Sequence, residues 1–78
     1  MTLDITSSHS TLFHGEVESV TLPGEMGSFT VLRNHASLLS SLTAGEIVYR
    51  TADGKEGKVP VQGGVVDVDD NVVSVCVY

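Results

Sequence analysis

Short runs in which apolar and polar residues alternate follow one another along the chain. Leu3 and Ile5 alternate with polar neighbours, Phe29 and Val31 do the same, and a longer run covers residues 46–52. A period of two places alternate side chains on the same face of an extended strand. Valine, threonine and isoleucine are frequent in these runs, and their branched side chains suit a pleated sheet. The pattern therefore predicts an all-β protein.

Turn-forming residues separate the runs and predict where the strands end. Proline fixes φ near the value that a turn needs, and glycine or asparagine accepts a positive φ. Asp53-Gly54 predicts a two-residue hairpin turn between residues 46–52 and a return strand at residues 58–62. Pro60 cannot donate a ladder hydrogen bond, so we expect this return strand at a sheet edge. Four places carry such signals: Pro23-Gly24, Asp53-Gly54, Gly63-Gly64 and residues 69–71.

Two segments fit the alternating pattern less closely. Residues 11–22 form one apolar-polar run whose alternation slips at Gly15, which predicts a β-bulge there. Residues 36–42 have leucines at helical spacing after Asn34, a possible helix cap, yet they are fewer than most helices need. For this segment we favour a short strand or a single turn. The whole pattern predicts one domain over residues 1–78, a two-sheet antiparallel β-sandwich of about eight to ten short strands.

The charge balance excludes some partners. Ten carboxylates against four lysines and arginines give a net charge of −6, and no basic stripe is present. Nucleic acids and anionic lipids are therefore disfavoured, and a basic protein surface is the natural partner, although acidity also serves solubility alone. Cys76 is the single cysteine, which fits a reducing compartment. Without a signal peptide or an apolar run that spans a bilayer, we expect an intracellular protein that reaches a membrane only by docking.

The sequence offers little catalytic or metal-binding chemistry. The histidines His9, His14 and His35 lack zinc-site spacing, and the acidic residues 67–70 lack the glycine and glutamate of a calcium loop. Cys76 lies among valines, so we expect an inert, partly buried thiol. The remaining candidates are Glu16 and Glu18, which share one side of the expected strand and could act as acid and base if buried. We expect no cofactor and no metal.

Four motifs in order carry a family resemblance. Residues 13–18 fit F-x-G-x-V-E, and residues 23–27 fit P-G-x-x-G. Residues 35–39 fit H-A-P-L-L with Ser37 in place of proline. Residues 71–75 fit N-x-V-T-V with Ser74 in place of threonine. In this order the motifs resemble the N-terminal domain of the epsilon subunit of F-type ATP synthases. That domain is a β-sandwich, in agreement with the strand pattern.

The resemblance implies a non-catalytic rotor subunit in the central stalk. Such a subunit docks on the gamma subunit and the c ring and helps to couple proton translocation to ATP synthesis. It lies peripherally at the cytoplasmic face of the bacterial inner membrane, which it touches only through the c ring. The positions that match the expected ring contact are Glu25, Met26, Gly27, Ser28, Arg33, Asn34 and His35.

Two departures from the family pattern qualify these expectations. Arg33-Asn34 replaces the usual Pro-Gly and Ser37 replaces proline, which should change the rigidity of this loop rather than the fold. Family members usually continue into two C-terminal helices that inhibit ATP hydrolysis or bind ATP. These 78 residues contain no counterpart of the helices, so we expect neither role from them. The alternative hypothesis is a small β-sandwich enzyme or ligand-binding module that uses Glu16 and Glu18.

Overall fold

Nine β-strands and no helix make up the computed structural model, which describes residues 1–78. The all-β prediction is therefore confirmed, with residues 38–42 forming a strand rather than a helical turn. The strands are β1 (Thr2–Thr6), β2 (Thr11–Glu16), β3 (Ser19–Gly24), β4 (Gly27–Leu32), β5 (Leu38–Leu42), β6 (Gly45–Arg50), β7 (Glu56–Val61), β8 (Gly64–Asp69) and β9 (Val72–Val77).

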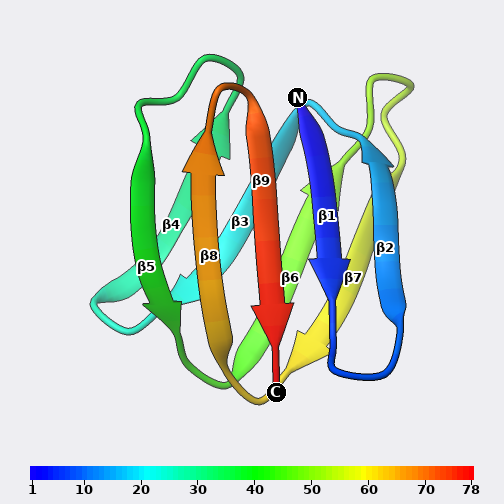
Figure 1. The fold of residues 1–78 in the computed structure, drawn as a ribbon. Helices are drawn as coiled ribbons and strands as arrows, with labels where there is room; N and C mark the ends of the chain where they lie inside the picture. The colour runs from blue at the N-terminus through cyan, green and yellow to red at the C-terminus, as the bar shows by residue number, and fades with distance from the viewer.

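The strands form two layers (Figure 1). One layer has the order β5-β8-β9-β1-β2, and the other has the order β4-β3-β6-β7. The layers join where β3 pairs with β5 through Gly24 and Leu42 alone. One pair departs from the expected antiparallel arrangement, because β1 runs parallel to β9. Parallel neighbours need a long connection, and nearly the whole chain lies between the first and last strands.

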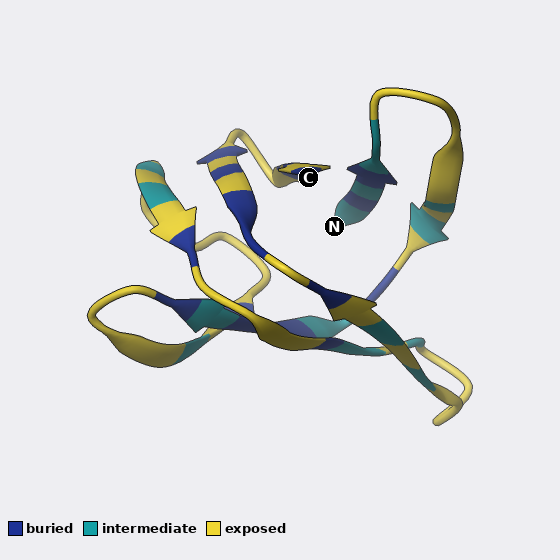
Figure 2. Cartoon of the chain, turned by 90° about the horizontal axis from the view of Figure 1, so that it is seen from below, coloured by how far each residue is buried: buried dark blue, intermediate teal, exposed yellow.

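A core of fourteen buried apolar side chains fills the space between the layers. Buried and exposed positions alternate along the strands (Figure 2), so that Val73, Val75 and Val77 point inward while Ser74 points outward. The thiol of Cys76 lies on the outward face and is exposed, which corrects the expectation of partial burial. The reason is its place in the alternation of β9, between Val75 and Val77.

The turn between β3 and β4 lies two residues later than predicted. Pro23 and Gly24 are the last residues of β3, and the turn residues are Glu25 and Met26. Pro23 pairs with Ser28 at a position where no hydrogen bond crosses to β4, so the missing N–H of proline costs nothing there. After the turn Gly27 has a φ of 124°, a conformation that suits glycine.

The bulge predicted at Gly15 is wrong. Gly15 lies opposite Leu3 in regular register, and the register of this pair shifts instead between Ile5 and Thr6. Residues 11–22 are also two strands rather than one, because the chain passes from one layer to the other after Glu16. A side chain at Gly15 would have its Cβ 3.2 Å from Cζ of Phe13, so the glycine leaves room for that ring.

Two further turns differ in how well the sequence predicted them. The β6–β7 connection is a five-residue loop, residues 51–55, rather than a two-residue turn at Asp53-Gly54. The Asp53 side chain explains this, because it accepts hydrogen bonds from the Thr51 hydroxyl and the Lys55 amide and so builds a wider loop. The turn predicted at residues 69–71 is confirmed, with Asp70 and Asn71 at φ values of 49° and 61°. The predicted edge position of Pro60 is also confirmed, since β7 ends its layer.

Candidate interaction surface

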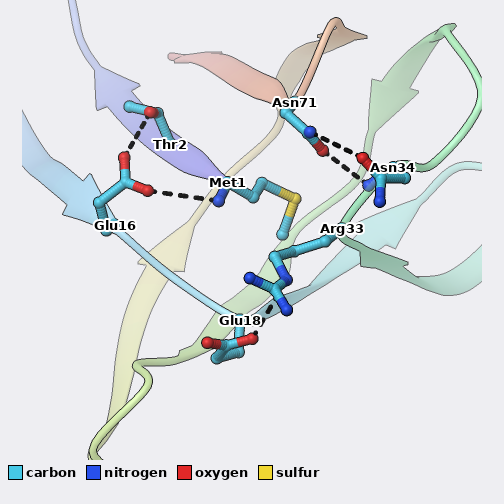
Figure 3. A network of polar contacts seen from close by, with 7 residues as sticks. All are labelled: Met1, Thr2, Glu16, Glu18, Arg33, Asn34 and Asn71. Atoms are coloured by element: carbon cyan, nitrogen blue, oxygen red, sulfur yellow. Dashed lines mark hydrogen bonds and ion pairs between the residues drawn. The ribbon is translucent and has the colours of Figure 1, made fainter.

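Glu16 and Glu18 line the same small surface hollow, but their carboxylates pair with different groups (Figure 3). Glu16 accepts a hydrogen bond from the Thr2 hydroxyl at 2.6 Å and lies 3.3 Å from the amino group of Met1. Glu18 lies outside β2 and pairs with Nε of Arg33 at 3.5 Å. The Thr2 hydrogen bond, followed by the Met1 ammonium, lowers the pKa of Glu16. An exposed carboxylate with a lowered pKa is suited to pairing with cations rather than to donating a proton.

The histidines lie apart on the surface. The imidazole Nδ1 of His14 is 3.7 Å from the carboxylate of Asp4, and that of His35 lies 2.7 Å from its neighbouring carbonyl at Ala36. No group of three or more histidine, cysteine or acidic side chains could hold a metal ion. The structure also has no helix of the length and hydropathy that a membrane-spanning segment needs.

Two surface hollows accompany the sandwich. The larger, of about 300 Å³, lies on the outward face of the first layer, where Leu39, Val65 and Cys76 meet Asp4 and Asp67. The smaller, of about 160 Å³, is lined by Met1, Glu16, Glu18 and Arg33 among others. Each mixes apolar walls with carboxylates at the protein surface, which is more typical of a contact surface than of an enclosed ligand site.

The seven predicted contact residues occupy the two ends of β4 (Figure 1). Residues 25–28 form the β3–β4 turn and the start of β4, and residues 33–35 follow its end. Residues 29–32 of β4 lie between the groups and place Ser28 and Arg33 about 17 Å apart. They do not form one compact patch, but the outer edge of β4 connects them.

The loop after β4 is held by hydrogen bonds to the β8–β9 turn (Figure 3). Asn34 donates its backbone N–H to Oδ1 of Asn71 at 2.6 Å, and Nδ2 of Asn71 donates to Oδ1 of Asn34 at 2.9 Å. Ser37 donates its hydroxyl to Asp69 at 2.6 Å. At the two places where Pro-Gly and proline were expected, side-chain hydrogen bonds thus restrain the loop. The sequence did not predict the contact between Asn34 and Asn71, because the two residues lie 37 positions apart.

Large apolar side chains are exposed at the β3–β4 turn, at the end of β4 and on β5. Met26 is 101% exposed at the turn, Leu32 is 58% exposed at the end of β4, and Leu39 is 74% exposed on β5. Leu32 and Leu39 were not among the predicted contacts, although exposed leucines beside an edge strand favour a protein partner. The fold and this surface define a small β-sandwich domain whose chemistry is that of protein contact.

Comparisons with known proteins identify the family. Residues 1–78 match the family described as ATP synthase, Delta/Epsilon chain, beta-sandwich domain. The ATP synthase epsilon chain of Nitratiruptor sp. is 45% identical over 69 residues, which are 88% of this chain and 54% of that protein. The epsilon chain of Wolinella succinogenes is 48% identical over 67 residues, 86% of this chain and 51% of that protein. The chain belongs to this delta/epsilon β-sandwich family of ATP synthases, and it spans about half the length of these relatives.

Solved structures agree with this assignment. A chain in the mitochondrial ATP synthase of Euglena gracilis, solved as OSCP/F1/c-ring in rotational state 1, matches with a TM-score of 0.90 at 25% identity, over 96% of this chain and 48% of that chain. A chain in the central stalk/c-ring structure of the Tetrahymena thermophila mitochondrial ATP synthase matches with a TM-score of 0.83 over 99% of this chain and 62% of that chain. At 17% identity, the second match supports the fold alone.

Proposed function

We propose that this domain is a non-catalytic central-stalk component of an F-type ATP synthase. It docks on the gamma subunit and the c ring and helps to couple proton translocation to ATP synthesis. The observation that carries the proposal is the family match over all 78 residues, supported by the TM-score of 0.90 to a chain of an F1/c-ring structure. Such a domain lies peripherally at the cytoplasmic face of a bacterial inner membrane and reaches the membrane only through the ring.

The proposed c-ring contact consists of the two ends of β4, residues 25–28 and residues 33–35. Glu25 and the fully exposed Met26 combine a negative charge with apolar surface at one end. At the other end the hydrogen bonds to Asn71 hold Asn34 in one conformation before any partner binds. A loop ordered in advance loses less conformational entropy on binding. The net charge of −6 favours basic loops as the partner surface.

A binding assay with purified components tests the proposal. The domain is titrated with the gamma subunit and, separately, with detergent-solubilised c ring from the same organism, and we expect a stable complex at micromolar concentration. Failure to bind either component would overturn the proposal. Adding the domain to the catalytic head should leave ATP hydrolysis largely uninhibited, and strong inhibition would show that the C-terminal helices are not needed for that effect.

Charge reversals locate the ring contact. Glu25→Lys should weaken binding to the c ring by about tenfold, since it turns an attraction to basic loops into a repulsion. Glu46→Lys makes the same charge change at an exposed position of β6 and should leave the affinity within about twofold. Equal effects of the two variants would show that net charge, rather than the β3–β4 turn, determines binding.

A further inference from the structure

The sandwich has four edge strands, and β4 is the one without visible protection. Natural edge strands carry charges, proline or bulges that prevent pairing with other chains. The edge strand β7 carries both Pro60 and the charged Lys58. The edge strand β2 has a register shift against β1. On β5, the Ser41 carbonyl already accepts a hydrogen bond from the Glu25 amide at 3.1 Å. By contrast β4, with the sequence GSFTVL, has no charged residue and no proline.

The backbone of β4 has alternate groups that point away from β3. Pro23 has no N–H, and its carbonyl accepts from the Thr43 amide on the far side, so its pair with Ser28 has no hydrogen bond to β4. Antiparallel pairs alternate, so Thr30 and Leu32 also present their backbone groups outward. Ten backbone hydrogen bonds lie outside the strand ladders, and none of them involves the amide of Ser28, Thr30 or Leu32. The Leu32 carbonyl already accepts a hydrogen bond from the His35 amide at 3.2 Å. The edge therefore offers outward donors at Ser28, Thr30 and Leu32 and outward acceptors at Ser28 and Thr30.

The side chains beside this edge fit an added strand. Phe29 is half-buried and packs against the core, next to the fully buried Val31. Side chains alternate between the two faces of a strand that is added at this edge. Those on the inner face would lie beside Phe29, and those on the outer face would lie beside the exposed Ser28 and Thr30. Leu32, at the end of the edge, would lose solvent exposure in the same step.

We infer that in the assembled rotor β4 pairs along its outer edge with an extended segment of another subunit. This inference rests on the proposed function for the presence of that partner, whereas the mode of contact comes from the edge itself. The segment is extended, is uncharged at its centre and has apolar residues at alternate positions, because main-chain hydrogen bonds supply the contact and alternate side chains meet Phe29. A second copy of this chain is a poorer occupant, since two chains of charge −6 repel each other.

Amide hydrogen exchange followed by NMR tests this pairing on the unmodified protein. The amides of Ser28, Thr30 and Leu32 should exchange quickly in the free domain and become protected at least about tenfold in the complex with gamma or with the c ring. The amides of Phe29 and Val31 bond to β3 and should already be protected in the free domain. They serve as internal references.

A proline variant tests the same groups through affinity. Thr30→Pro removes an outward N–H without breaking a bond to β3, and it should weaken binding by at least about tenfold. The matched control is Thr30→Val, which also loses the hydroxyl that lies 2.9 Å from the Thr21 hydroxyl but keeps the N–H. We expect Thr30→Val to bind within about twofold of the unmodified domain.

Each outcome has a distinct meaning. Protection of the three amides together with sensitivity to Thr30→Pro supports strand pairing. Binding without that protection overturns the inference and leaves the proposed function intact. Protection that appears in the domain alone at high concentration, with dimers by light scattering, overturns the assignment to another subunit. Absence of binding to both gamma and the c ring overturns the proposed function and, with it, the assignment of the partner segment to another subunit.

Discussion

The paired amides of Asn34 and Asn71 give a quantitative test of how the loop after β4 is held. Asn71→Gly removes both hydrogen bonds of the pair, the 2.6 Å bond from the Asn34 amide and the 2.9 Å bond to the Asn34 side chain. Asn71 has a φ of 61°, which glycine also adopts readily, so the substitution introduces no backbone strain. The lost free energy therefore reports on the hydrogen bonds.

The expected magnitude follows from two exposed hydrogen bonds. Each contributes about 0.5 to 1 kcal/mol at such a site, so Asn71→Gly should lower the free energy of unfolding by about 1 to 2 kcal/mol. For a domain of this size that corresponds to a fall in Tm of about 4 to 8 °C per kcal/mol. Asn34→Gly removes only the side-chain bond and should cost about half as much. The double variant should be no less stable than Asn71→Gly, which gives a coupling energy of about 0.5 to 1 kcal/mol.

Urea unfolding followed by circular dichroism measures all four proteins of this cycle. The control is Asp70→Gly, which changes the neighbouring turn residue at a φ of 49° and should be neutral or slightly stabilising. The reasoning is refuted if Asn71→Gly is no more destabilising than Asp70→Gly. It is also refuted if the effects of Asn34→Gly and Asn71→Gly simply add.

Three further predictions concern the core, a close approach of strands and a surface carboxylate. Ile47→Ala, at a fully buried position, should lower the free energy of unfolding by about 3 kcal/mol in urea titrations, and a loss under 1 kcal/mol would contradict its burial. Gly64→Ala should cost about 3 kcal/mol in the same assay, because the new Cβ would overlap the backbone carbonyl of Cys76, and a neutral result would contradict that close approach. The pKa of Glu16 is lowered from 4.5 in the folded protein, chiefly by the Thr2 hydrogen bond. The ionised form of Glu16 therefore stabilises the fold above pH 4.5, and this contribution is lost as the pH falls below that value. The Tm difference between the unmodified protein and Glu16→Gln should therefore shrink between pH 7 and pH 3, and a constant difference would count against the pairing.

Local patterns in the sequence were sufficient for the all-β class and for the turn at residues 69–71. The alternation of β9 assigns Val73 and Val75 to the core because burial on one face of a sheet imposes a period of two. Pro60 predicts an edge strand because it has no N–H for a ladder. The turn predicted at Pro23-Gly24 lies two residues too early. Proline is tolerated both in a turn and at a strand position without a ladder hydrogen bond, and the sequence alone does not distinguish these two places.

The sequence by itself determined that this chain is a β-sandwich of the delta/epsilon family, since periodicity and motif order are properties of neighbouring residues. Only the tertiary structure decided that β1 runs parallel to β9 and that Asn34 meets Asn71. Each of these facts joins residues that are far apart in the chain. Their contact depends on how the two layers close around the core, and no local pattern records that closure.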